Sequence, residues 1–119
     1  MLQIKHKRIF DAGEGIRIAW AEEANFRLHI FSAGAAIGIS WLFNISAIEW
    51  AIVLLTIGVV LAAEIFNTAL EELCDMLQPA HDPHVGKIKD LAAGAVFTTW
   101  WAALFVGVAI FLPRLIELL

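Results

Sequence analysis

Three stretches of the chain are apolar enough, and long enough or nearly so, to cross a bilayer. Residues 28–48 and 91–113 contain no formal charge. Between them an apolar run ends at Glu64, and apolar residues then continue in helical spacing to residue 73. A helix needs about 20 apolar residues to span the hydrocarbon core. The pattern therefore predicts three transmembrane helices, over about residues 28–48, 49–77 and 87–113.

The first 25 residues follow a different pattern, in which apolar and charged side chains are mixed. Ile9, Ile16 and Trp20 stand among basic and acidic residues. Such mixing at helical spacing is typical of an amphipathic helix lying on a membrane surface. We expect this surface helix over about residues 3–25, with a solvated N-terminal tail as the alternative.

Composition supports an all-α membrane protein with one domain, residues 1–119. Hydrophobic residues make up 61% and charged residues 17% of the chain, and the mean hydropathy is +0.78, whereas ordinary domains have about 45–50% and 25%. The eight Lys and Arg residues are too few and scattered for nucleic-acid binding. The lone Cys74 permits no intrachain disulfide. We expect no cleaved signal peptide, because no short apolar run with a small-residue cleavage site follows the basic start.

Basic residues predict the orientation of the spans, since cytoplasmic loops carry an excess of Lys and Arg. Arg114 alone follows the third span. The other seven precede the first span or lie between the second and third: Lys5, Lys7, Arg8, Arg17, Arg27, Lys87 and Lys89. We therefore expect the N-terminus and the second loop in the cytoplasm.

Polar residues on the second span carry the candidate chemistry. Glu64, Asn67, Glu71 and Asp75 are spaced by three, four and four residues, which places them on one helix face. An ionisable group at membrane depth is costly and favours a functional reading for Glu64 and Asn67. For Glu72 and Asp75, an ordinary solvated helix end explains the sequence equally well.

The carboxylates also suggest a magnesium site. Mg²⁺ prefers hard oxygen ligands and usually takes one or two carboxylates plus phosphates and water. Glu71 is the natural ligand, and a second acid is expected from Glu22-Glu23, which precedes the first span at the same depth. Di-iron chemistry needs Glu-x-x-His pairs, and the sequence has none.

The loop after the second span contains further candidates. Asp82 precedes Pro83 and marks a turn. Lys87 and Lys89 could neutralise nucleotide phosphates, although membrane anchoring is the favoured role for Lys87. His81 and His84 fit ordinary loop histidines. The sequence has neither a Walker A loop nor a protein-kinase signature, so any phosphoryl transfer needs another architecture.

Three motifs together resemble the small prokaryotic diacylglycerol kinase family, which includes the undecaprenol kinases. The motifs are Glu23-Ala-Asn-Phe-Arg27, Glu64-x-x-Asn67-Thr-Ala-x-Glu71 and Lys89-Asp90-x-x-Ala-Gly-Ala95, in the family's order. The resemblance covers about residues 13–115. It implies a homotrimer with three transmembrane helices and a surface helix per subunit, and active sites shared between subunits.

The resemblance also implies roles for individual residues. Glu64 looks like the general base for the lipid hydroxyl, with Asn67 as its polar partner. Glu23 and Glu71 look like the carboxylates that hold Mg²⁺ on ATP. The nucleotide side is implied to include Lys89, Asp90 and Asp82. This chain departs from the family at His81-Asp82-Pro83, where Tyr-His or His-Pro is frequent, and at Asp11, near which an aromatic residue is usual.

The expected function is therefore phosphorylation of a membrane lipid by ATP. The lipid is undecaprenol or diacylglycerol, and the tail Phe111-Leu-Pro-Arg-Leu favours the undecaprenol branch. Two other classes remain as alternatives: a small proton-coupled exporter, which uses a membrane glutamate but normally needs four spans, and a non-enzymatic assembly subunit whose acids pair between helices.

Overall fold

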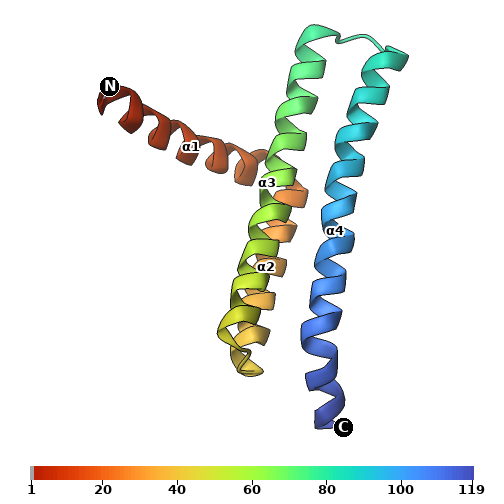
Figure 1. The fold of residues 1–119 in the computed structure, drawn as a ribbon. Helices are drawn as coiled ribbons and strands as arrows, with labels where there is room; N and C mark the ends of the chain where they lie inside the picture. Colours follow the sequence, from red (N-terminus) through yellow and green to blue (C-terminus); the bar gives the residue numbers. More distant parts are fainter. Residues whose placement is uncertain (1) are drawn as a thin grey trace.

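Helices form at all four predicted positions in the computed structural model, which describes the backbone of residues 2–119 and the side chains from residue 8 onward. The side chains of Lys5 and Lys7, used above for orientation, lie outside the described part. The elements, joined by short connections (Figure 1), are α1 (Leu2–Glu22), α2 (Ala24–Leu42), α3 (Ala47–Leu77) and α4 (Pro83–Leu118).

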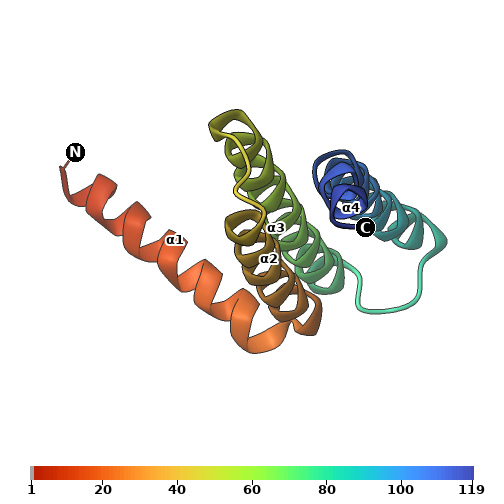
Figure 2. The ribbon, with the colours of Figure 1, turned by 90° about the horizontal axis from the view of Figure 1, so that it is seen from below.

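Helix α1 leaves the other three at a steep angle, as a surface helix would (Figures 1 and 2). Glu23 alone separates it from α2, and its extended backbone (φ −113°, ψ 108°) makes the bend. The Arg27 guanidinium donates to the carbonyl oxygens of Trp20 and Ala21, at 2.7 and 3.2 Å. These bonds use carbonyl groups that the end of α1 leaves unpaired, and they tie α1 to the first turn of α2.

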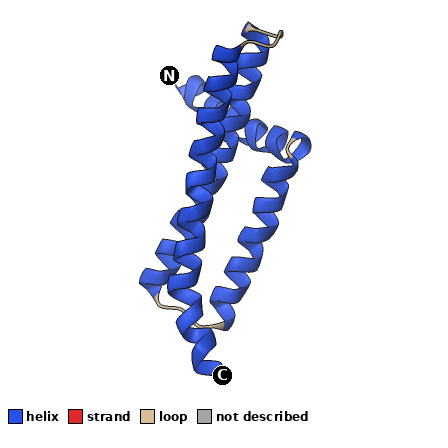
Figure 3. Cartoon of the chain, turned by 90° about the vertical axis from the view of Figure 1, so that its right-hand side faces the viewer, coloured by secondary structure: helices blue, strands red, loops and turns tan. Residues whose placement is uncertain are grey.

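A short turn joins α2 to α3, and the two helices run antiparallel (Figure 3). Asn44 has a positive φ of 52°, which suits Asn because its short polar side chain tolerates the left-handed region. Ser46 then caps α3: its side chain accepts from the Glu49 N–H, and the Glu49 carboxylate accepts from the Ser46 N–H. This reciprocal capping box ends the turn sharply.

Helices α3 and α4 continue past the level where α1 meets the bundle (Figure 1). They have 31 and 36 residues, or about 46 and 54 Å at 1.5 Å per residue, against a hydrocarbon core of about 30 Å. Both are long and apolar enough to span a membrane. The short extension formed by both helices is the part that the loop of residues 78–82 connects.

Helix α2 begins and ends earlier than the predicted span of residues 28–48. It starts at Ala24 because the extended backbone of Glu23 ends α1 there, and it stops at Leu42 because Asn44 reverses the chain. Of the three predicted spans, α3 and α4 meet the length and apolarity needed to cross a membrane, so the first span, α2, remains a prediction. The second and third spans agree more closely with α3 and α4, and the surface helix agrees with α1.

Most large apolar side chains remain exposed in the single chain, including Trp41, Leu55 and Phe105. A small cluster of Ile45, Val53 and Ile110 is buried at the end of the bundle where the turn joins α2 to α3. Apolar exposure on this scale is incompatible with water but natural in lipid or in an oligomer. The structure is thus that of an all-helical membrane protein.

Candidate active site

Glu64 is a charged residue placed inside the bundle, with only 5% of its surface exposed. Its Oε1 atom lies 3.1 Å from Nε2 of His29 on α2. The angle of approach is poor for a hydrogen bond, and within the described chain neither atom has another partner. The His29 ring also packs against Trp100 of α4, with ring centroids 5.3 Å apart. Three helices therefore meet around one carboxylate.

Asn67 and Glu71 continue the same face of α3 toward its C-terminal end. The Asn67 amide donates to Oε1 of Glu71 at 3.2 Å. Its own oxygen is buried and, among the described residues, without a hydrogen-bond partner. The amide thus fixes the Glu71 carboxylate rather than Glu64. The step of seven residues from Glu64 to Glu71 corresponds to about 10 Å along the helix, so Glu64 lies farther from the C-terminal end of α3.

Glu23 brings a carboxylate from the bend between α1 and α2. Among the described residues its side chain makes no capping hydrogen bond with α2, so it is not engaged in holding the helix. Partial burial raises the pKa of Glu23, and the nearby carboxylates of Glu71, Glu22, Glu64 and Glu72 raise that pKa further. The bend therefore places Glu23 in a field of negative charge, with Glu71 as its strongest acidic neighbour.

A divalent cation would relieve this repulsion, and the oxygen ligands available are those that Mg²⁺ prefers. The part of the chain with described side chains has no group of three or more His, Cys, Asp or Glu suited to a metal. Glu23 and its strongest acidic neighbour Glu71 are two carboxylates, a number that Mg²⁺ commonly takes together with phosphate and water.

The predicted nucleotide residues are not gathered at one point in the single chain. Lys89 pairs with Asp75 of α3, with Nζ 2.5 Å from Oδ1. Asp90 instead lines an open groove of about 760 Å³ along α4, together with His81, Lys87 and Gly94. The two neighbours in sequence therefore serve different faces of α4.

Asp82 acts as the N-terminal cap of α4. Its carboxylate accepts from the N–H groups of His84 and Val85, at 2.8 and 3.3 Å, and Pro83 occupies the first helical position. These bonds lower the pKa of Asp82 below its ordinary value. The sequence indicated a turn here, and the structure adds that the same side chain starts the helix.

His29 is the neighbour of Glu64 that the sequence analysis does not single out. One signal was present in the sequence: like Glu64, His29 is an ionisable side chain within an apolar segment, and two such groups on neighbouring helices are expected to pair. Glu72, by contrast, is exposed, in keeping with the solvated alternative.

Comparisons with known proteins agree on one family. The model described as prokaryotic diacylglycerol kinase matches residues 11–111. The undecaprenol kinase of Bacillus subtilis is 38% identical over 109 residues, which cover 92% of this chain and 89% of the relative. A diacylglycerol kinase of Synechocystis is also 38% identical over 109 residues, covering 91% and 62%. The diacylglycerol kinase of Escherichia coli K12 is 29% identical over 83 residues, covering 70% and 68%.

Proposed function

The chain belongs to the prokaryotic diacylglycerol kinase family and is a lipid kinase of the membrane; on that premise we propose that it transfers the γ-phosphoryl group of ATP to the hydroxyl of undecaprenol. Family membership overturns the exporter and assembly-subunit alternatives. The observation that supports the chemistry best is the buried Glu64, which lies deeper than the Glu23 and Glu71 carboxylates.

In the proposed reaction Glu64 accepts the proton of the lipid hydroxyl while that oxygen attacks the γ-phosphorus. The bond from the γ-phosphorus to the bridging oxygen breaks, and ADP leaves with the electron pair. Phosphoryl transfer depends chiefly on positioning and charge neutralisation, so a single base at the correct depth suffices. Mg²⁺, held by Glu23 and Glu71, would neutralise charge on the donor phosphates.

The remaining polar residues position these groups. Asn67 holds the Glu71 carboxylate through its amide and keeps it directed away from Glu64. Lys89 brings a cation to the cytoplasmic side of the site, where Asp75 holds it until phosphate competes for it. Asp90 and Asp82 border the nucleotide. Asp90 lines the groove on α4, and Asp82 stands between His81 and Pro83, which also line it.

We further propose that three chains assemble with shared sites, each contributing α1, α2, α3 and α4. The buried oxygen of Asn67 lacks a hydrogen-bond partner within the described chain, and such atoms are usually satisfied in the finished assembly. The separation of Lys89 from Asp90 on α4 gives a second reason, because one α4 can serve its own site and a neighbour's. Small residues on α2 and α4, such as Gly34 and Gly94, permit close helix packing.

The proposed location is the bacterial inner membrane, with α1 on the cytoplasmic surface and α2, α3 and α4 as the three spans. The distribution of basic residues supports this orientation. So do the positions of the candidate residues along the helices, since Glu23 lies at the bend between α1 and α2, Glu71 in the last turns of α3 and Lys89 in the first turns of α4.

A lipid-acceptor assay with the full chain in vesicles tests the proposal. Purified protein is incubated with Mg²⁺, γ-labelled ATP and either undecaprenol or a diacylglycerol, and the labelled lipids are separated. We expect label in both lipids, with a higher kcat/KM for undecaprenol. A preference for the diacylglycerol would refute the substrate assignment alone, whereas label in neither lipid would refute the activity.

A further inference from the structure

The contact between His29 and Glu64 has no role in the function proposed so far. The two residues belong to different helices, α2 and α3, and their closest side-chain atoms are 3.1 Å apart. The His29 side chain is 17% exposed and the Glu64 side chain 6% exposed. Burying two ionisable side chains is costly unless they interact, so this pairing needs an explanation beyond packing.

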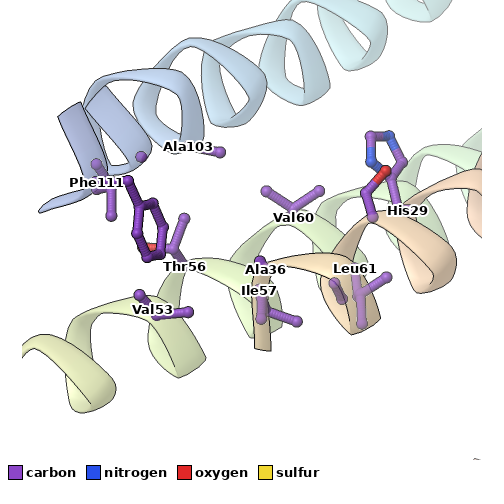
Figure 4. A pocket seen from close by; sticks show the side chains of 13 residues that line it. His29, Ala36, Val53, Thr56, Ile57, Val60, Leu61, Ala103 and Phe111 are labelled. Carbon is purple, nitrogen blue, oxygen red and sulfur yellow. The ribbon is translucent and has the colours of Figure 1, made fainter. Parts of the chain in front are cut away.

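An apolar cavity of about 210 Å³ begins at His29 and runs along the bundle toward Phe111. Figure 4 shows His29 at one end of the cavity and Phe111 at the other, with Ala36, Ile57 and Val60 between them. Helices α2, α3 and α4 all contribute to the lining. The shape suits one hydrocarbon chain lying along the helices with its polar end at His29.

Hydroxyl groups in the lining do not compete with His29 for that polar end. The Ser32 hydroxyl donates to the Leu28 carbonyl at 2.9 Å, and the Thr56 hydroxyl donates to the Ile52 carbonyl at 2.7 Å. Both donors are thus used within their own helices. Among the side chains that line the cavity, His29 is the one that contacts the Glu64 carboxylate, with Nε2 3.1 Å from Oε1.

Trp100 restricts how the imidazole can move. Its ring lies against His29 at an interplanar angle of 49°, so rotation of the imidazole away from Glu64 would displace an aromatic contact. In a serine protease an aspartate carboxylate orients the histidine that acts as the base. Here the imidazole would be the orienting group and the carboxylate the reacting one.

We propose that His29 is the positioning residue of the phosphoryl-transfer site, holding the Glu64 carboxylate toward the hydroxyl of a lipid whose first chain segment occupies the cavity between α2, α3 and α4. The inference rests on the proposed role of Glu64 as the base. His29 gains no net proton: the proton of the lipid hydroxyl goes to Glu64, and the 3.1 Å contact with the imidazole holds that carboxylate in place. Contacts of this kind that are poorly aligned in the free enzyme tighten in the complex with substrate.

Two substitutions at His29 separate positioning from packing. His29→Leu removes both nitrogens, whereas His29→Gln keeps an N–H near the position of Nε2. We expect His29→Leu to lower kcat by roughly 10- to 100-fold, as replacement of residues that orient a reactive group does elsewhere. The KM for ATP is expected to stay unchanged. His29→Gln should recover most of the lost kcat, although its volume resembles that of the leucine.

A matched substitution at the far end of the cavity serves as the control. Gly107 lines the cavity, and a Cβ built there would meet no atom within 4 Å. Gly107→Leu should therefore fold normally and fill the cavity. We expect it to raise the KM for the lipid while leaving kcat and the KM for ATP unchanged, which is the opposite pattern to His29→Leu.

A double-mutant cycle with Glu64→Gln decides whether His29 acts through Glu64. Residues that act as a unit give non-additive losses, so His29→Leu should cost nothing further in the Glu64→Gln background. Additive losses, or equal losses in His29→Leu and His29→Gln, would overturn the positioning role, as would full kcat in His29→Leu. If Glu64→Gln alone kept full activity, the proposed base would fail instead, and the two failures remain distinguishable.

Discussion

The two ends of α3 treat their charged groups in opposite ways. At the N-terminal end of α3, proposed to face away from the cytoplasm and called the outer end below, Ser46 and Glu49 cap one another. The Arg114 guanidinium binds both oxygens of Glu49 there, at 2.5 and 2.7 Å. Arg114 also donates to the Ile110 carbonyl at 2.9 Å, and Ile110 belongs to the buried cluster below. Glu49 and Arg114 are thus geometrically matched partners.

In the second half of α3, proposed to lead toward the cytoplasm, the same helix buries Glu64 beside an imidazole at a poor angle. It also leaves the Asn67 oxygen without a partner among the described residues, and its Glu71 is the strongest acidic neighbour of Glu23. Natural sequences are locally consistent except where function demands otherwise. The contrast supports the proposal that the first turns of α3 hold the hairpin together and that its second half holds ligands.

Replacing Glu64 should produce the largest effect and break the comparison most directly. Glu64→Gln keeps the shape but cannot accept a proton, so we expect kcat to fall on the order of 10²- to 10⁴-fold, the usual contribution of a general base. Steady-state kinetics in lipid vesicles measure it. Glu49→Gln, an equivalent change at the outer end, is the control and should leave kcat unchanged. A comparable fall in both variants would contradict the assignment.

Magnesium dependence sharpens the comparison at the second acid. Glu71→Gln should raise the Mg²⁺ concentration for half-maximal activity by at least about tenfold, a loss seen even when a residue behind a metal ligand is replaced. The adjacent Glu72 is exposed, so Glu72→Gln is the matched control. Titration of activity with Mg²⁺ at saturating ATP gives the result. An equal shift in both variants would mean that general acidity, and not Glu71, attracts the metal.

The outer end should respond in stability and not in turnover. Arg114→Gln removes the guanidinium that binds both oxygens of Glu49, and we expect the melting temperature in detergent to fall by several degrees with kcat unchanged. Arg114→Lys should fall between the two, because an ammonium cannot make the paired contact. Loss of turnover at an unchanged melting temperature would remove the distinction between the two ends.

The smallest effect is expected at Asp82, which caps α4 in the cytoplasmic extension. Asp82→Ala should lower the melting temperature by a few degrees at neutral pH, since a capping acceptor is lost. Because the folded-state pKa of Asp82 is lowered, its stabilisation is present above the ordinary pKa of 3.8 and disappears as the pH falls through the lowered value. Thermal scans should therefore converge in acid, whereas Asp82→Asn should remain close to wild type at neutral pH.

The sequence predicted the helices well because apolar length and charge position decide them. It placed the ends of α2 less accurately, since the Asn44 turn and the Arg27 contacts to α1 depend on backbone geometry. Glu64, Asn67 and Glu71 were identifiable from spacing along one helix. The Glu64–His29 and Lys89–Asp75 pairs were not, because each joins different helices and depends on their packing.

The bend at Glu23 couples this enzyme to the thickness of its membrane. Arg27 fastens the end of α1 to α2, so α1, proposed to float at the headgroup boundary, carries the Glu23 carboxylate with it. Spanning helices adapt to bilayer thickness by tilting, whereas an interfacial helix stays with the surface. The distance from Glu23 to Glu71 should therefore change with bilayer thickness. Turnover should pass through an optimum as the acyl chains of the host lipid are lengthened.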